Sequence, residues 1–321
     1  MTYIDFIVKN LLRIIYAYRI KEWILLIKYH SFHYSKKVPL IIAVADGRRS
    51  SKGLTDRFKG MVSLYALAKA THSNFKILFT HPFNLTDYLI PKQYDWIPDD
   101  SELSDSVWDV RYRIIKKYPG VNKLYKELPI NRQYRVYANY NYLENINKKF
   151  DKQFDFASLF HELFIPTKLL QDEIDHHLEK IGKKYISCTF RFQSLLGDFK
   201  EYHFRSAPKR KQKKLLEVCV QALKELIEKN NCPVVVTSDS TRFLSEIKGI
   251  NQVYTIPGRV VHMDCTFGEK REVYLKSFVD FFMIAHAEKV YILGTKEMYP
   301  SHFPLYAATI YKKPFERIRI E

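Results

Sequence analysis

A continuous apolar run, Val38–Ala45 (VPLIIAVA), is the feature that most restricts the fold of this chain. A strand that is apolar on both faces is typical of a parallel sheet that helices cover on both sides. The chain continues with a polar loop, with apolar residues at helical spacing over 56–70, and with a second apolar run, Phe75–Thr80. Strand, helix and strand make a βαβ unit, so the sequence predicts an α/β fold.

The same alternation returns in the second part of the chain. After a helix over 166–181, we expect strands at 185–192, 233–237, 252–256 and 290–293, and helices at 209–230, 241–247, 273–287 and 302–311. The stretch 82–155 has no clear period and is expected to hold long loops and short helices.

The length of 321 residues exceeds what one hydrophobic core usually supports. We therefore expect two α/β domains, 1–165 and 166–321, with the ligand site in a cleft at their junction.

The chain carries 52 Lys and Arg against 35 Asp and Glu, a net charge of +17. Such a surplus attracts polyanions: nucleic acid, anionic lipid or a nucleotide diphosphate. A nucleic-acid-binding protein is the second hypothesis, although the sequence has no nucleic-acid-binding signature. Basic residues cluster at the start of a predicted helix whose other side is apolar, so a solvated helix face also explains them. They are Arg205, Lys209, Arg210, Lys211, Lys213 and Lys214.

Residues 4–28 place apolar side chains at helical spacing, with basic residues such as Arg13 and Lys21 between them. Such a helix packs on the protein's own core or lies on an anionic membrane surface, and both interpretations stay open. The apolar run 23–27 is too short to span a bilayer, and no secretory signal is apparent. The four cysteines form no CxxC pair. We expect a cytoplasmic protein, with peripheral contact to the inner face of the membrane as a further expectation.

Polar side chains follow the predicted strands, where open α/β sheets bind their ligands. In the first such loop, Gly53 suits a turn, and Thr55 or Asp56 suits a helix cap. Arg57 and Lys59 are expected to project at the mouth of the cleft.

In the second loop, Arg191 ends a buried strand, where a cation is costly unless it meets an anion. A guanidinium can hold a diphosphate through two parallel hydrogen bonds, and the alternative partner is a nearby carboxylate. Asp198 follows Gly197 and could simply stabilise the turn.

The third and fourth loops offer further polar groups. Asp239 and Ser240 could contact a nucleoside or cap the next helix. Ser301 is expected to cap a helix whose first N–H groups favour phosphate. The acidic stretch 99–102 lies among Pro and Ser residues and follows no strand, so no metal site is assigned.

The order of these motifs resembles the GDP-fucose-dependent fucosyltransferase superfamily. The motifs are G-L-x-D-R-x-x-G before an Ala-rich helix, a strand ending in x-R with a following G-D, then T-x-D-S, then S-x-F with A-A. The resemblance covers about residues 38–315 and includes the nodulation, α1,6-, α1,2- and protein O-fucosyltransferases. It implies a GT-B fold, in which two Rossmann-like domains face each other across a cleft.

The resemblance also implies a function: an inverting transfer of fucose from GDP-fucose to a glycan or lipid-linked glycan, without a metal or other cofactor. Synthesis of a bacterial surface polysaccharide suits the basic, cytoplasmic, membrane-adjacent profile. The chain departs from the family at Thr189, where many relatives have His, and at Thr55-Asp56, where Asn is common. Another nucleotide sugar, or an inactive binding protein, therefore stays an alternative.

By the same resemblance, residues 166–321 bind the donor and residues 1–165 lie on the acceptor side. Arg191 would bind the diphosphate and stabilise the leaving GDP. The other donor-binding candidates are Asp198, Asp239, Ser240, Lys296, Ser301, His302 and Phe303. Gly53, Thr55 and Arg57 would approach the transferred sugar. An inverting transfer also needs a base for the acceptor hydroxyl, for which Asp56 is the first candidate and Asp198 the second.

Overall fold

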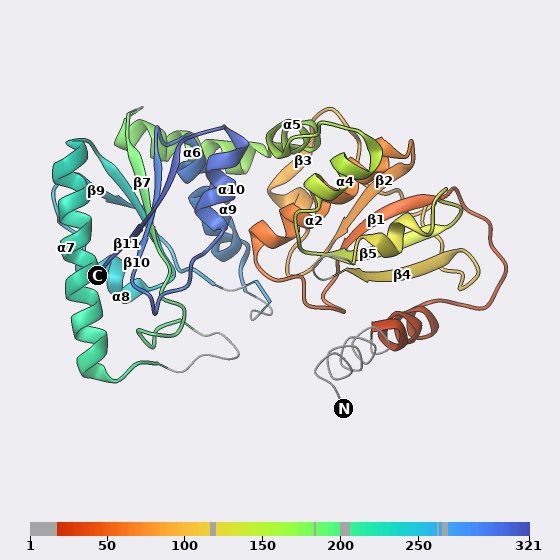
Figure 1. The fold of residues 1–321 in the computed structure, drawn as a ribbon, viewed down its shortest axis with the longest axis horizontal. Coiled ribbons are helices and arrows are strands. Elements are labelled where there is room, and N and C mark those ends of the chain that lie inside the picture. Colours follow the sequence, from red (N-terminus) through yellow and green to blue (C-terminus); the bar gives the residue numbers. More distant parts are fainter. Residues whose placement is uncertain (1–17, 116–119, 183, 200–205, 262, 265–268) are drawn as a thin grey trace. The chain divides into compact units, whose positions relative to one another are not determined.

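The computed structural model describes residues 18–115, 120–182, 184–199, 206–261, 263–264 and 269–321. The first part of the expected N-terminal helix, 4–17, and the basic residue Arg205 lie outside this description. The chain forms two compact units, each built around a parallel sheet (Figure 1). The first unit takes the described residues up to Ser51 together with Asp56–His81 and Tyr94–Asp155, and the second takes Lys52–Thr55, Pro82–Gln93 and Phe156–Glu321.

The first unit has a four-stranded sheet in the order β2-β1-β5-β4, with every pair parallel. Its strands are β1 (Leu40–Ala45), β2 (Asn74–Phe79), β4 (Val110–Ile115) and β5 (Gln133–Ala138). Its helices are the N-terminal helix over 18–29, α2 (Leu54–Ala70, with its first residues in the second unit), α3 (Asn122–Tyr125) and α4 (Leu143–Phe150).

Strand β1 is buried on both faces, as its apolar run predicts. Ile42 and Val44 pack in one core cluster with Leu25 and Leu26 of the N-terminal helix. Ala43 and Ala45 of β1 line a pocket together with Arg57 and Met61 of α2. The part of the N-terminal helix over 18–29 therefore does pack on the protein's own core.

The expectation that 82–155 holds only loops and short helices is wrong, because β4 and β5 lie within it. Polar residues interrupt the apolar pattern of β5, and they form hydrogen bonds with residues that lie about thirty positions earlier in the chain. Arg135 donates to the carbonyl of Ser104 at 3.0 Å. The Gln133 amide accepts from the Ser104 N–H at 2.9 Å and donates to the carbonyl of Glu102 at 2.7 Å. Both side chains are thus hydrogen-bonded, although Nε of Arg135 has no hydrogen-bond partner within the described residues.

The second unit has a five-stranded parallel sheet in the order β11-β10-β7-β8-β9. Counted along the chain within this unit, the order is 3-2-1-4-5, as in a doubly wound nucleotide-binding sheet. The strands are β7 (Ile186–Phe190), β8 (Val234–Ser238), β9 (Val253–Thr255), β10 (Val290–Gly294) and β11 (Phe315–Arg319). The edge strand β11 lies beyond the last strand that the sequence pattern predicts.

Helices cover both faces of this second sheet (Figure 1). Helix α7 packs on one face through a core of apolar side chains, and α9 packs on the other. The helices are α5 (Phe156–Leu163), α6 (Lys168–Ile181), α7 (Lys209–Asn230), α8 (Thr241–Glu246), α9 (Arg271–His286) and α10 (Phe303–Ile310). The predicted α/β class, with two Rossmann-like halves, is confirmed.

A short segment from the first part of the chain completes the second unit. It contains a 3₁₀ turn, η1 (Leu85–Asp87), and strand β3 (Leu89–Pro91), which pairs antiparallel with β6 (Phe164–Pro166). Tyr88 is fully buried, with its ring stacked 4.5 Å from that of Phe278 and its hydroxyl donating to the carbonyl of Arg271 at 2.7 Å.

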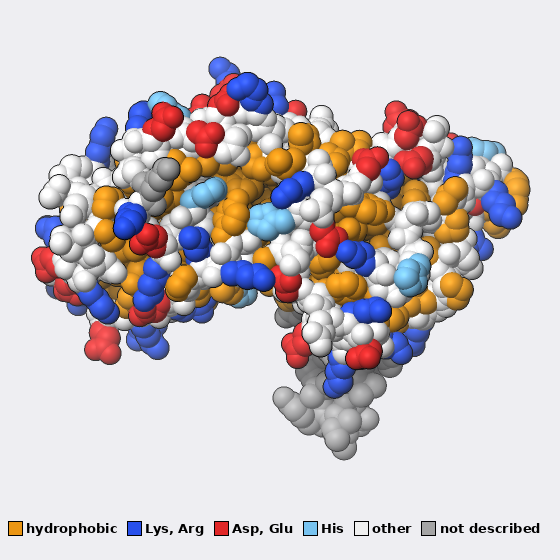
Figure 2. All heavy atoms as spheres, turned by 90° about the horizontal axis from the view of Figure 1, so that it is seen from above, with side chains coloured by type: hydrophobic (Ala, Val, Ile, Leu, Met, Phe, Trp, Pro, Cys, Tyr) orange, Lys and Arg blue, Asp and Glu red, His pale blue; other side chains and the backbone are white. Residues whose placement is uncertain are grey.

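None of the described helices is both long and apolar enough to cross a membrane. On the face drawn in Figure 2, Lys and Arg side chains lie interspersed with Asp and Glu. The positive charge on that face is therefore spread over the surface and does not form one basic block.

Candidate functional site

In the second sheet the strand order reverses between β7 and β10, and open α/β sheets bind ligands at such a point. Arg191 is the first residue after β7. Its carbonyl accepts a hydrogen bond from the N–H of Tyr299, in the loop after β10, at 3.2 Å. Two of the loops that the sequence singled out therefore lie side by side.

The carboxylate of Asp239, directly after β8, holds the loop after β7. Its Oδ1 accepts from the N–H of Phe192 at 2.8 Å, and its Oδ2 accepts from the N–H of Gln193 at 2.6 Å. Nη1 of Arg191 lies 2.9 Å from the same Oδ2. Burial raises the pKa of Asp239, and the positive charge of Arg191 and the backbone N–H groups lower it. The carboxylate partner that the sequence left open for Arg191 is thus Asp239.

The arginine reaches the surface even though its partner does not. The side chain of Arg191 is 18% exposed and that of Asp239 only 1%. The guanidinium carbon also lies 4.7 Å from the centre of the Phe199 ring, so the group is held between a carboxylate and an aromatic face. This arrangement fixes the direction of a positive charge at the carboxyl end of the sheet.

Asp198 and Ser240 shape the neighbouring helix start. Oδ2 of Asp198 accepts from the hydroxyl of Ser240 at 2.8 Å, from the hydroxyl of Thr241 at 3.2 Å and from the N–H of Arg242 at 2.8 Å. Ser240 is fully buried, and its hydroxyl accepts from the N–H of Phe243 at 3.0 Å, which caps α8. Both residues therefore organise the end of β8.

The loop after β10 brings Lys296, His302 and Phe303 to the same end of the sheet as Arg191. Lys296 and His302 are exposed. The hydroxyl of Ser301 accepts from the N–H of Phe303 at 3.1 Å, where α10 begins. This bond satisfies one of the N–H groups that a helix start leaves unpaired.

The first loop differs from its sequence prediction. Because α2 begins at Leu54, Thr55 and Asp56 lie in its first turn and not at a cap position. The expectation that Arg57 and Lys59 project is wrong, since they are only 2% and 6% exposed. Gly53 has no positive φ, so no turn there requires a glycine.

The buried cations of this helix have partners close by. Arg57 donates to the carbonyl of His81 at 2.5 Å, and its guanidinium carbon lies 4.8 Å from the Phe79 ring. Lys59 forms an ion pair with Asp56, whose side chain is 36% exposed. The contacts of Arg57 come from β2 and from the residues after it, so the local sequence pattern does not reveal them. The pair Asp56–Lys59 has the i,i+3 spacing of a local helical ion pair.

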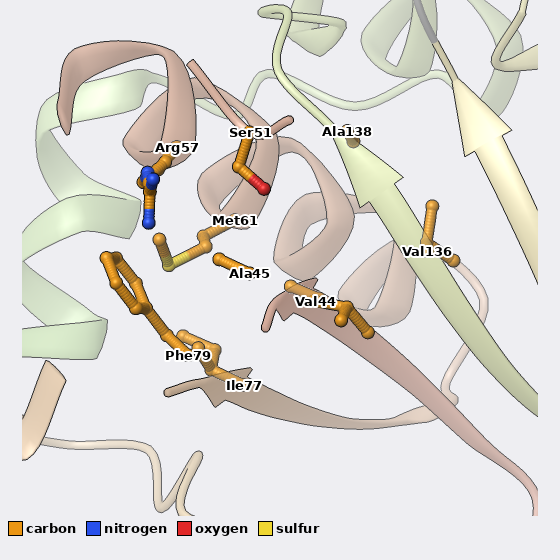
Figure 3. Close-up of a pocket in the computed structure, with 10 residues that line it drawn as sticks. Val44, Ala45, Ser51, Arg57, Met61, Ile77, Phe79, Val136 and Ala138 are labelled. Carbon is orange, nitrogen blue, oxygen red and sulfur yellow. The ribbon is translucent and has the colours of Figure 1, made fainter. Parts of the chain in front are cut away.

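A small pocket lies in the first unit at the carboxyl ends of β1, β2 and β5 (Figure 3). The strand order of this sheet reverses between β1 and β5. Arg57 and Ser51 contribute polar groups to the pocket, while Met61 and Phe79 are among its apolar walls. Arg57 is therefore a pocket residue despite its burial.

The sequence analysis missed a polar network beside this pocket. Asp46, directly after β1, accepts from the hydroxyl of Tyr137 at 2.8 Å and lies 3.3 Å from Nε of Arg48. Arg48 donates to the hydroxyl of Tyr112 at 3.1 Å, and that hydroxyl lies 3.0 Å from Nε2 of His30. Burial is the main cause that raises the pKa of Tyr137 and lowers the pKa of His30 to about 4. The position of Asp46 after an apolar strand is the signal that could have revealed it.

Within the described residues, no three His, Cys, Asp or Glu side chains lie close enough together to hold a metal ion. No protein-family model matches the sequence, and no curated protein sequence matches it.

Solved structures do match the chain. A mutant of the Arabidopsis thaliana fucosyltransferase FUT1, in complex with GDP, is 13% identical, with 94% of this chain and 75% of that chain covered and a TM-score of 0.55. NodZ α-1,6-fucosyltransferase soaked with GDP-fucose is 13% identical, with 85% and 93% covered and a TM-score of 0.52. Fucosyltransferase NodZ from Bradyrhizobium is 14% identical, with 85% and 92% covered and a TM-score of 0.51. At these identities the likeness is one of fold, and it confirms the predicted GT-B type.

Proposed function

We propose that this chain is a glycosyltransferase that transfers fucose from GDP-fucose to a glycan acceptor. The observation that carries the proposal is the position of Arg191, at the strand-order reversal of the second sheet and held there by Asp239. A guanidinium in this position suits a diphosphate, because its planar N–H groups match two phosphate oxygens. Fucosyltransferases with GDP or GDP-fucose share the fold.

The proposed reaction is a single displacement. The oxygen of the acceptor hydroxyl attacks the anomeric carbon, the bond from that carbon to the diphosphate breaks, and GDP leaves with the electron pair. The configuration at the anomeric carbon is inverted. Arg191 stabilises the charge that develops on the diphosphate, and exposed Lys296 adds to it. In this proposal fixed cationic side chains take the part that a metal ion takes in other transferases.

The acceptor proton passes to a carboxylate, and Asp56 is the first candidate. Its side chain is 36% exposed, so a substrate can reach it. Asp198 is the second candidate, but one of its oxygens already accepts three hydrogen bonds at the start of α8. Asp56 is also paired, with Lys59, but the exposure of its carboxylate makes it the first candidate for the base in this proposal.

The other site residues fall into two groups in this proposal. Asp198, Asp239 and Ser240 act mainly by positioning loops, because their side chains bond to the protein itself. The donor phosphate and sugar contact Lys296 in the loop after β10, and Ser301, His302 and Phe303 at the start of α10. On the acceptor side, Gly53 and the start of α2, with Thr55 and Arg57, approach the transferred sugar.

We propose a cytoplasmic enzyme of bacterial surface-polysaccharide synthesis, in peripheral contact with the inner face of the membrane, that acts on a glycan or lipid-linked glycan and not on nucleic acid. The sequence has no nucleic-acid-binding signature, which supports a glycan acceptor over nucleic acid.

The test is calorimetric binding of GDP, GDP-fucose, UDP and CMP to the wild type, to Arg191→Ala and to Lys224→Ala. Lys224 is an exposed cation on α7 and serves as the matched control. We expect GDP and GDP-fucose to bind selectively, with Arg191→Ala weakening both by roughly 10- to 100-fold, the loss expected when a charged hydrogen bond is removed. Selective binding of UDP or CMP would exclude the fucose donor. No binding of any nucleotide would favour the binding-protein and nucleic-acid hypotheses.

A further inference from the structure

We propose that the N-terminal helix over 18–29 carries a docking face for an anionic lipid surface. The face consists of an apolar ridge, Ile20, Trp23, Ile24 and Ile27, with basic side chains along its borders. The inference deepens the proposed function, because it names the surface and the lipid chemistry that would bring the enzyme to a lipid-linked acceptor.

One side of this helix is fixed to the first unit. Leu25 and Leu26 are 5% and 7% exposed and belong to the core that also contains β1 and β4. On the same side, the carboxylate of buried Glu22 accepts from the N–H of Ile114 at 2.8 Å and lies 3.8 Å from Nη1 of Arg113. This side is therefore not available to a partner.

The opposite side is apolar and exposed. Trp23 is 64% exposed, Ile24 54%, Ile27 53% and Ile20 47%. At about 100° per residue, these four side chains point away from Leu25 and Leu26 and gather in one stripe. Single exposed apolar residues need no explanation, but a contiguous stripe marks an interaction surface.

The charges around the ridge select the partner. Arg19 lies along one border of the ridge, and Lys21 and Lys28 lie along the other, all of them exposed. Lys36 and Lys37 follow in the next segment. Glu22 is the only acidic residue between 18 and 45, and it faces the core. An apolar stripe with basic borders fits acyl chains below anionic headgroups. A second copy would bring like charges together.

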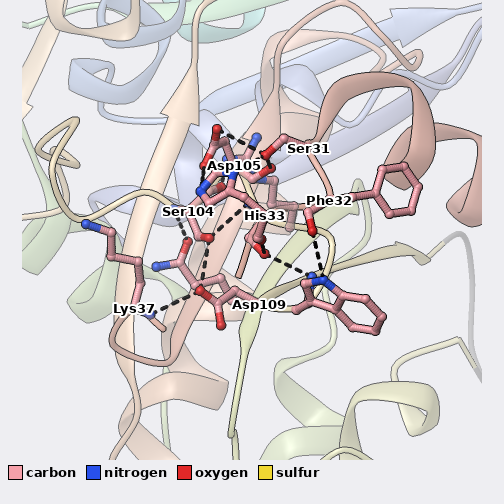
Figure 4. A network of polar contacts seen from close by, with 11 residues as sticks. Ser31, Phe32, His33, Lys37, Ser104, Asp105 and Asp109 are labelled. Atoms are coloured by element: carbon pink, nitrogen blue, oxygen red, sulfur yellow. Dashed lines mark hydrogen bonds and ion pairs between the residues drawn. The ribbon is translucent and has the colours of Figure 1, made fainter. Parts of the chain in front are cut away.

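The segment after the helix is anchored, so the ridge stays outward without a rearrangement (Figure 4). The N–H of Val107 donates to the carbonyl of Ser31 at 2.9 Å, and the hydroxyl of Ser106 donates to the carbonyl of His33 at 2.7 Å. Nε1 of Trp108 donates to the carbonyl of Phe32 at 3.2 Å. The rings of Trp108 and Phe32 add exposed aromatic surface, which suits a membrane interface.

The first test is co-sedimentation of the full chain with vesicles of equal parts phosphatidylglycerol and phosphatidylcholine, compared with phosphatidylcholine alone. We expect binding to the anionic vesicles only. The double variant Trp23→Ser with Ile27→Ser should lower the bound fraction at least tenfold. The control Ile165→Ser with Leu169→Ser removes two similarly apolar, exposed side chains of the second unit and should bind as the wild type does. Equal loss in both variants would overturn the proposal.

The second test separates the basic borders from the net charge. The triple variant Arg19→Glu, Lys21→Glu, Lys28→Glu should abolish binding to anionic vesicles. The triple variant Lys209→Glu, Arg210→Glu, Lys211→Glu on α7 changes the net charge by the same amount without changing the docking face, and should keep binding within about threefold, because salt screens the net charge more than direct contacts. Equal loss in the two triple variants would assign binding to the overall charge and overturn the proposal.

GDP binding and oligomeric state complete the experiment. A chain that binds GDP but not anionic vesicles would overturn this inference and leave the proposed function standing. Vesicle binding without GDP binding would support this inference and overturn the proposed function. A dimer that the ridge variant converts to a monomer, with no vesicle binding in the wild type, would show that a second copy covers the ridge.

Discussion

The guanidinium of Arg191 lies 2.9 Å from the carboxylate of Asp239, and that carboxylate also accepts the N–H groups of the two residues that follow the arginine. One buried carboxylate thereby fixes both the side chain and the backbone of the same loop. A cation that is oriented before its ligand arrives loses less conformational entropy on binding. Asp239 is on this reasoning a positioning residue.

Replacement of Asp239 by Asn should weaken GDP binding about tenfold, because the uncharged amide no longer orients Arg191. Calorimetry of GDP binding measures the effect, with Asp172→Asn as the control, since that exposed carboxylate only pairs with Lys168 on α6. In transfer assays the GDP-fucose KM should rise more than kcat falls. Unchanged GDP affinity in a folded Asp239→Asn variant would contradict the positioning role.

His30 should make the free energy of unfolding depend on pH. Burial, followed by the positive charge of Arg135, lowers its pKa from 6.5 to about 4 in the folded chain. The unfolded chain therefore binds the proton more readily, so stability is complete above pH 6.5 and falls as the pH drops toward 4. The slope is at most about 1.4 kcal/mol per pH unit.

Urea denaturation between pH 7 and pH 4 measures this contribution in the wild type and in His30→Phe. We expect His30→Phe to lose the part of the pH dependence of the free energy of unfolding that His30 causes. The nearby His33, whose side chain is 54% exposed, provides the control His33→Phe, which should keep it. Parallel pH curves for the wild type and His30→Phe would refute the assignment.

Gly60 and Gly53 should respond in opposite ways to alanine. A Cβ at Gly60 would lie 2.0 Å from the carbonyl oxygen of Ala138, so α2 would have to move away from β5. We expect a loss of about 3 kcal/mol in the free energy of unfolding. A Cβ at Gly53 meets no atom within 4 Å, and Gly53→Ala should be neutral or gain up to about 1 kcal/mol. Similar effects of the two substitutions would contradict the close packing of α2.

Removing one partner of the buried ion pair in α9 should lower the free energy of unfolding more than replacing both partners by apolar residues. Nζ of Lys276 lies 2.5 and 2.6 Å from the two carboxylate oxygens of Asp280, and the two side chains are 4% and 5% exposed. Removing the carboxylate in Asp280→Leu leaves a buried cation, which we expect to cost about 3–5 kcal/mol.

The double variant Lys276→Met with Asp280→Leu should recover most of this loss, because two apolar side chains of similar size need no partner. Chemical denaturation of the single and double variants gives the coupling free energy. The exposed pair Lys168–Asp172 has the same spacing and should show a coupling of less than about 1 kcal/mol. An equally small coupling in α9 would contradict a buried, dry pair.

The sequence predicted those strands that form continuous apolar runs, such as β1, β8 and β10. It missed β4 and β5, because polar residues interrupt their apolar pattern, namely Arg111, Arg113, Gln133 and Arg135. Some of their partners lie elsewhere in the chain, as Ser104 does for Arg135 and Glu127 for Arg113. A local pattern records the polar residue but not its partner.

Some features of the candidate site could likewise be predicted from the sequence, and others could not. That Arg191 ends a strand was readable from the sequence, but its pairing with Asp239 depends on β7 and β8 being neighbours in the sheet. The burial of Arg57 was not readable, because the carbonyl of His81 that receives it belongs to the segment after β2. Loop position could be predicted, whereas the direction of each side chain required the strand order.

Segment 82–93, with Tyr88 stacked on Phe278, has an evolutionary consequence. Residues 156–321 are not a cassette that recombination at one point could exchange. A chimera that joins residues 156–321 to a foreign first half would lack the strand that pairs with β6 and the ring that covers Phe278. Changes in ligand specificity should therefore arise by point substitution in loops of the candidate site, such as 191–199, and not by shuffling of whole halves.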